Sequence, residues 1–270
     1  MPTLSRRFPI PATLALLALI STFTLPATAQ TVASGAATHP TQPPAGTSES
    51  MLFEAANRER SAASLPPLQW DASLAAAARK HAELMAQRRT LSHQFPGEAL
   101  LQDRATQSGA RFSVIAENVA EGPTVMGLHT QWMNSPPHRA NILADDMNAL
   151  GIAIVPSGNL LFAVEDFAEA VPSLNLDTQE TQVEKLLSLR GLKVVKETSD
   201  TRKTCEMDRG FVGPKPLSVL RYETTDLSRL PEDIDQKVGS GKYHSAAVGA
   251  CDSSGSDGFT QFRIAILLFP

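Results

Sequence analysis

The stretch that organises the chain runs from Ser92 to Asn141 and reads SHQFPGEALLQDRATQSGARFSVIAENVAEGPTVMGLHTQWMNSPPHRAN. It contains two histidines and a glutamate at wide, similar intervals: His93, Glu117 and His138. Each of the three stands beside a turn signal or an apolar run rather than in a charged patch, so only tertiary folding can bring them together. We therefore expect a polar cluster on one wall of a folded domain, and this cluster is the candidate site.

Helical and strand patterns alternate on both sides of this stretch. Helices are predicted around Leu52–Ala56 with Ser50 as a cap, from Asp71 to near Thr90, over Glu98–Ser108 and from Thr124 to the proline pair 136–137, after which a tight segment begins at His138. Strands are predicted over Phe112–Ala120, Ala149–Val155 and Leu160–Phe167, the last two as a hairpin. These elements together predict helices on both sides of an antiparallel sheet.

Two further histidines fall on the predicted helices. His81 lies on the apolar stripe of the second helix, which indicates a hydrogen-bonded core histidine rather than a ligand. His129 lies beside the stripe of the fourth helix and is interpreted as structural or exposed.

A domain boundary is predicted at Pro172–Asp177, followed by a smaller α+β unit. Its last hairpin loosely resembles the Ala149–Phe167 hairpin, with a Ser- and Gly-rich tip at Asp252–Gly258 that we expect to be flexible. The predicted elements are a helix around Val183–Arg190, a helix over Pro231–Val238, and strands over Lys193–Glu197, Leu217–Glu223, Tyr243–Cys251 and Phe259–Phe269.

The N-terminus has the pattern of a secretory signal peptide. Arg6 and Arg7 precede an apolar run over Ile10–Leu25, and Ala27-Thr28-Ala29 is a small-residue cleavage pattern. Residues 30–48 are rich in Ala, Thr, Pro and Gly and predict a flexible linker. The predicted division is therefore a signal peptide at 1–29, a linker at 30–48 and domains at 49–171 and 172–270, with no membrane span in the mature chain.

Export also decides the interpretation of charge and cysteine content. Cleavage after Ala29 removes two arginines and no acidic residue, which moves the formal net charge from −4 to −6. An acidic protein is a poor partner for nucleic acid or an anionic membrane. In a secreted or periplasmic protein the two cysteines, Cys205 and Cys251, are expected to pair, although two free thiols or half of a metal site stay open.

Five segments in this order resemble the CAP superfamily, which comprises cysteine-rich secretory proteins, antigen 5 and pathogenesis-related proteins (SCP-like). They are Asn57–Arg60, Leu65–Asp71, Ser92-His93, Ala116–Asn118 and Trp132–Leu143. The resemblance covers roughly Glu49 to Ala170 and implies an α-β-α sandwich, which agrees with the pattern of helices and hairpin.

The resemblance also implies a shallow cleft with two histidines and two acidic residues, able in some members to hold a divalent metal. His93, His138 and Glu117 match three of the four. Many eukaryotic members carry the second acidic residue on the tryptophan helix, where this chain has Asn134 and Ser135, and the Thr-Gln pair of the last family strand is replaced by Val164-Glu165. Glu165, Glu121 and Glu98 are the remaining candidates.

Three functions fit this cluster. The first is an exported binding module with a His/Glu cleft, acting on a cell-envelope, lipid-like or protein partner. The second is a metal-assisted hydrolase, in which His93 and His138 bind Zn²⁺ or another divalent cation and Glu117 is a ligand or general base. The third is a purely structural envelope protein without a ligand, in which the second unit is the docking surface and the polar network of the first only anchors loops to the sheet. Because CAP relatives are more often associated with binding than with a catalytic cycle, we favour the first, and no catalytic residue is assigned.

Overall fold

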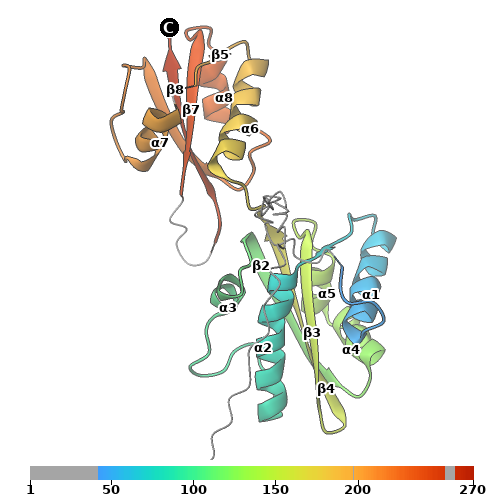
Figure 1. Ribbon diagram of the computed structural model, residues 1–270. Helices are drawn as coiled ribbons and strands as arrows, with labels where there is room; N and C mark the ends of the chain where they lie inside the picture. Colours follow the sequence, from blue (N-terminus) through green and yellow to red (C-terminus); the bar gives the residue numbers. More distant parts are fainter. Residues whose placement is uncertain (1–41, 197, 253–258) are drawn as a thin grey trace, which may run out of the picture. The chain divides into compact units, whose positions relative to one another are not determined.

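The computed structural model describes residues 42–196, 198–252 and 259–270. The described residues contain two separate four-stranded sheets (Figure 1). We call the elements over residues 48–170 the first unit and those over residues 176–269 the second unit. The predicted signal peptide, most of the linker and most of the Asp252–Gly258 tip lie outside the described residues. Within the described residues, no helix is long and apolar enough to cross a membrane.

The sheet of the first unit has the strand order β1-β3-β4-β2. It contains β1 (Gln69–Trp70), β2 (Phe112–Gly122), β3 (Ala149–Ser157) and β4 (Leu160–Ala170). The predicted hairpin is confirmed, because β3 and β4 pair antiparallel from Ala149–Ala168 to Ser157–Leu160. The prediction of a purely antiparallel sheet is wrong at one edge, since the two-residue β1 runs parallel to β3.

The five helices that the structure describes in the first unit are α1 (Ser48–Ala62), α2 (Ala72–Arg88), α3 (Leu101–Gln107), α4 (Val125–Asn134) and α5 (Pro136–Ile142). Asp71 caps α2 as predicted, accepting from the amides of Ser73 and Leu74. Thr47, rather than the predicted Ser50, caps α1. α4 ends before the proline pair as predicted, and the predicted tight segment that follows is helical. Pro136 and Pro137 begin α5, whose first turn does not need the amide hydrogens that prolines lack.

Helices cover both faces of this sheet (Figure 1). α1, α4 and α5 pack on the face that presents Leu150, Ile152 and Ile154. α2 packs on the opposite face, where Gly151 brings the backbones of helix and strand together: a Cβ there would lie 2.1 Å from the amide nitrogen of Ala75. The result is the α-β-α sandwich that the sequence implied.

The second unit has the strand order β5-β7-β8-β6. Its strands are β5 (Lys193–Val194), β6 (Ser218–Thr224), β7 (Ser245–Cys251) and β8 (Phe262–Phe269), and its helices are α6 (Leu176–Leu189), α7 (Thr198–Glu206) and α8 (Glu232–Val238). α6 and α8 pack on one face and α7 on the other (Figure 1). The sequence did not predict α7, because its inward residues include Thr201, Thr204 and Cys205 rather than an apolar stripe. This unit confirms an α+β fold.

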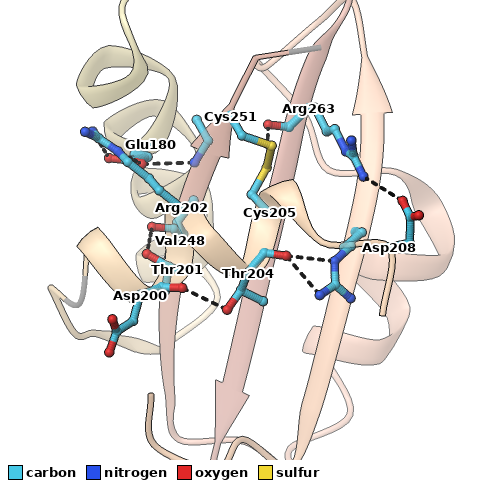
Figure 2. Close-up of a disulfide and its surroundings, with 12 residues drawn as sticks. Glu180, Asp200, Thr201, Arg202, Thr204, Cys205, Asp208, Val248, Cys251 and Arg263 are labelled. Carbon is cyan, nitrogen blue, oxygen red and sulfur yellow. Dashed lines mark hydrogen bonds and ion pairs between the residues drawn. A yellow bond between two sulfur atoms is a disulfide. The ribbon is translucent and has the colours of Figure 1, made fainter. Parts of the chain in front are cut away.

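The predicted disulfide is present. Cys205 of α7 and Cys251 of β7 are bonded, with their Cα atoms 5.8 Å apart, and both side chains are buried (Figure 2).

Candidate functional site

The candidate site surrounds β2, an edge strand of the first sheet. Glu117 and Asn118 are adjacent in β2 and therefore point to opposite faces of the sheet. In the ladder with β4, Glu117 stands opposite Asp166 and Asn118 stands opposite Glu165. These four polar residues form one layer through the sheet, which we call the polar layer. Glu117 and Asp166 lie on one face, and Asn118 and Glu165 lie on the other.

Glu117 is buried, and neighbouring side chains neutralise its negative charge. One carboxylate oxygen accepts from the guanidinium of Arg104, which is itself buried, and the other lies 3.0 Å from Nδ1 of His93. Charge-assisted bonds of this kind fix the carboxylate in one orientation. Glu117 therefore anchors His93 to the sheet.

His81 of α2 is hydrogen-bonded within the same network. Its ring nitrogens lie 2.6 Å from Oε1 of Glu98 and 2.8 Å from the carbonyl oxygen of Ser92, and the side chain has no exposed area. This confirms the predicted core histidine. Because Glu98 also lies 3.5 Å from Arg104, the loop that carries His93 is tied to α2 and to Glu117.

The two candidate histidines lie together. The rings of His93 and His138 have their centroids 6.5 Å apart, and 60% of the His93 side chain is exposed. The hydrogen bond to Glu117 raises the pKa of His93, because it stabilises the imidazolium. Burial lowers the pKa of His138, and the neighbouring His93 lowers it further. Of the two rings, His93 therefore keeps its proton to a higher pH than His138 does.

The other face of the layer holds α5 against the sheet. The amide of Asn118 donates to the carbonyl oxygen of His138 (3.1 Å) and to Oε2 of Glu165 (3.2 Å), and Asn141 donates to Oδ1 of Asn118 (2.9 Å). Glu165 is completely buried, and burial raises its pKa to about 8. Asn118 thus fixes the position of the backbone carbonyl of His138.

Asp166 is a member of the layer that the sequence interpretation missed. It has no exposed area, and within the described residues neither of its carboxyl oxygens meets a hydrogen-bond donor. Burial and the nearby Glu117 raise its pKa. One signal could have identified it: a strand covered on both faces reads as a nearly continuous apolar run, and two adjacent acids interrupt this one.

The structure also separates the three candidates for a second acidic residue. Glu98 belongs to the His81 and Arg104 network, while Glu165 is on the face opposite Glu117. Glu121 lies further along β2, where its carbonyl oxygen accepts from Gln131. Among the described residues, no group of three or more His, Cys, Asp and Glu side chains is arranged to hold a metal ion.

Other predicted residues have local roles. The Ser92 hydroxyl donates to the carbonyl oxygen of Gln94 (2.7 Å), so it serves a turn. His129 is buried, with Nε2 3.6 Å from Oε1 of Glu59, which fits a structural role. Trp132 is part of the core.

Comparison with known proteins identifies the fold around this site. Residues 53–167 match the family model for CAP, the cysteine-rich secretory protein family. This part of the chain is a CAP domain. Two curated relatives from Bacillus subtilis (strain 168) match the same region. The uncharacterized protein YkwD is 33% identical over 113 residues, which is 42% of this chain and 44% of that protein. The uncharacterized membrane protein YlbC is 30% identical over 112 residues, or 40% of this chain and 32% of that protein.

Solved structures of related proteins cover a similar share of the chain. An extracellular protein with an SCP domain from Bacillus anthracis is 28% identical, with a TM-score of 0.42, and covers 45% of this chain and 40% of that one. An outer surface protein of Borrelia burgdorferi is 21% identical, with a TM-score of 0.44, and covers 48% of this chain and 97% of that one. Since the chain spans less than half the length of the curated relatives, their similarity concerns the CAP domain alone.

Proposed function

We propose that this protein is an exported CAP-type binding module whose recognition site is the histidine pair His93 and His138. The single observation that supports this most is the hydrogen bond between His93 and the buried Glu117, beside the ring of His138. When the ring is protonated, Nδ1 donates to the carboxylate and Nε2 of His93 is a second donor that the carboxylate does not use. The exposed side chain then offers a positioned, partly cationic donor to a partner.

The electrostatics favour an anionic partner group. Because its pKa is raised, His93 is the member of the pair that is protonated more readily, and the carboxylate of Glu117 behind it is already paired with the guanidinium of Arg104. An anion such as a phosphate or carboxylate therefore fits the outer face of the pair. Cell-envelope lipids and glycans, and acidic protein segments, carry such groups, which agrees with the partner classes expected for an exported protein.

The metal-assisted hydrolase is the second candidate, supported by two imidazoles close to one carboxylate. The donor set does not fit a three-ligand site as it stands. One oxygen of Glu117 is bonded to Arg104 and the other to His93 Nδ1, so a cation would have to displace one of these contacts. Metal binding by His93, His138 and Glu117 therefore remains a prediction. A purely structural role for the network is the third alternative.

Calorimetric titration of the purified protein separates these functions. Inorganic phosphate and Zn²⁺ are the two probes, and the variants are His93→Ala and His244→Ala. His244 is an exposed histidine of the second unit and serves as the matched control. Binding of phosphate that His93→Ala abolishes and His244→Ala retains supports the proposal.

Stoichiometric Zn²⁺ binding that depends on His93 and persists after Glu117→Gln would instead favour a metal centre on the two imidazoles. Phosphate binding that is absent, or equal in both histidine variants, contradicts the proposed recognition site.

A further inference from the structure

The two sheets of this protein have the same topology. The strand orders β1-β3-β4-β2 and β5-β7-β8-β6 match, and in each sheet the first pair is parallel and the other two are antiparallel. Along the chain both units run helix, strand, helix, strand, helix and hairpin, and α3 and α5 are additions of the first unit. Many other strand orders are possible for four strands, so this agreement calls for a residue-level comparison.

Backbone hydrogen bonds supply an alignment of the two units. As β1 ends, the amide of Asp71 donates to the carbonyl oxygen of Leu150. As β5 ends, the amide of Val195 donates to that of Ala246. Matching these bonds places Leu150 of β3 at the position of Ala246 of β7, and every later residue of the two strands follows in register.

A buried glutamate joins three elements in the second unit (Figure 2). Glu180 of α6 accepts from Nε and NH2 of Arg202 in α7, both at 2.7 Å, and from the backbone amide of Ala250 in β7 at 2.9 Å. The first unit has the same arrangement. Glu49 of α1 accepts from Arg79 of α2 at 2.5 Å and from the amide of Ile154 in β3 at 3.4 Å.

This glutamate–arginine–amide contact supports the alignment independently. The backbone bonds alone place Ile154 at the position of Ala250, and these are the two amides that the glutamates bind. In both units the glutamate comes from the first helix and the arginine from the second. Neither contact was used to match the strands.

We infer that the second unit is another copy of the CAP sandwich, in which apolar core has replaced the polar cleft. Across the aligned ladders, every member of the polar layer has an apolar counterpart: Val219 for Glu117, Leu220 for Asn118, Ile266 for Glu165 and Leu267 for Asp166. The second unit therefore has no carboxylate in this layer, and the chain has one cleft of this kind although it has two CAP-type sheets.

The disulfide gives the alignment a testable consequence. Matching Arg79 to Arg202 along the helices places Ala82 of α2 at the position of Cys205. Matching the strands places Val155 of β3 at the position of Cys251. If the second unit repeats the first, Ala82 and Val155 must be close enough to be bridged.

A contact one turn further along supports this proximity. The Ser157 hydroxyl donates to the carbonyl oxygen of Ala86 at 2.9 Å. Four helical residues advance by about 6 Å and two strand residues by about 6.6 Å, so the step back from Ser157 and Ala86 leads to Val155 and Ala82. Both of these belong to the same apolar cluster.

The test is a double cysteine variant of the full chain, Ala82→Cys/Val155→Cys, purified under oxidising conditions. Non-reducing peptide mapping is expected to show the new disulfide beside Cys205–Cys251, and the melting temperature should fall on reduction by more than in the parent. The matched control is Glu83→Cys/Val155→Cys, because Glu83 is exposed on the other side of α2. New thiols that stay free in both variants overturn the inference.

A second measurement does not depend on engineered cysteines. Hydrogen exchange should show loss of protection at the Ile154 amide in Glu49→Ala and at the Ala250 amide in Glu180→Ala, in each case in that unit alone, because alanine offers no acceptor. Full protection in both variants would show that the shared contact is not a feature of the fold.

The claim of one cleft per chain rests on the proposed function and has its own readout. Inorganic phosphate is expected to bind once per chain, with no residual binding in His93→Ala. A disulfide in Ala82→Cys/Val155→Cys without phosphate binding would reject the proposed ligand and keep the repeat. A second phosphate site that survives His93→Ala and is lost after a substitution in the second-unit layer would overturn the loss of the cleft.

Discussion

The first and second units have the same strand pairing, but the aligned layer of side chains is polar in the first unit and apolar in the second. In the first unit, four buried polar side chains occupy the middle of the sheet; of these, Glu117 is paired with Arg104 and His93, and Asn118 accepts from Asn141. In the second unit the aligned layer contains only valine, leucine and isoleucine, and a disulfide joins the helix to the sheet beside it. The topology therefore does not require the polar layer.

The difference shows where the first unit gives up stability. Buried carboxyl groups cost free energy unless hydrogen bonds or opposite charges offset the loss of water. Glu117 is compensated, whereas Asp166 and one oxygen of Glu165 lack a donor within the described residues. Residues that weaken a core beside the exposed His93 indicate a site, which agrees with the proposed binding role.

Exchanging one residue of the layer between the units should give the largest effect. Leu267→Asp in the second unit buries a carboxyl without compensation and should lower the free energy of unfolding by on the order of 5 kcal/mol. Asp166→Leu in the first unit should change it far less. Urea denaturation followed by circular dichroism measures both. Equal losses would mean that the two layers are not chemically distinct.

Removing the disulfide should affect the second unit alone. For a separation of 46 residues, the chain-entropy relation gives a loss of about 4 kcal/mol in a Cys205→Ser/Cys251→Ser variant. Both tryptophans, Trp70 and Trp132, lie in the first unit, so tryptophan fluorescence reports its unfolding separately. A fluorescence midpoint that moves as much as the circular dichroism midpoint would contradict this independence.

A paired glycine substitution tests whether each sheet meets its helix at equally close range. A Cβ at Gly151 would lie 2.1 Å from the Ala75 nitrogen, and one at Gly249 would lie 2.3 Å from backbone atoms of Thr201. Each alanine variant should lose about 3 kcal/mol in its own unit, because backbone must move. Gly158→Ala, in open space at a φ of +62°, is the control and should lose only about 1 kcal/mol of backbone strain.

The pH dependence of the free energy of unfolding should also distinguish the polar layer of the first unit from the apolar layer of the second. Burial raises the pKa of Glu165 from 4.5 to about 8, so between these values the unfolded chain ionises while the folded chain stays protonated. The contribution of Glu165 to the free energy of unfolding is therefore fully present below pH 4.5. It declines as the pH rises toward 8 and stays constant above that value. Glu165→Gln should remove the Glu165 part of this decline, about 1.4 kcal/mol per pH unit between these values, and leave the part that comes from Asp166, whose pKa is also raised.

Urea midpoints from about pH 4 to about pH 9 measure this slope, with Glu121→Gln as a control in the same strand ladder. The aligned Ile266 cannot titrate, so the second unit should contribute no such slope from this position. A slope in Glu165→Gln equal to that of the parent would show that Glu165 does not contribute to the decline.

Local patterns predicted the first unit well. The cap at Asp71, the hairpin and the core histidine His81 are set by neighbours in the chain or by helical spacing, and the structure confirms each. The predicted Glu98–Ser108 helix was too long, because the Glu98 carboxylate binds His81 and the helix begins only at Leu101. The hydrophobic pattern did not predict α7, because this helix lacks an apolar stripe and packs on the sheet through small side chains.

The sequence by itself determined the CAP-type succession of elements, the cysteine pair and the three residues His93, Glu117 and His138, because motif order, cysteine count and turn chemistry are properties of the linear chain. Only the tertiary structure decided that Arg104 neutralises Glu117, that Asp166 stands behind it, and that the second sheet repeats the first. Strand order and cross-strand register join residues far apart in sequence, and no local pattern contains that information.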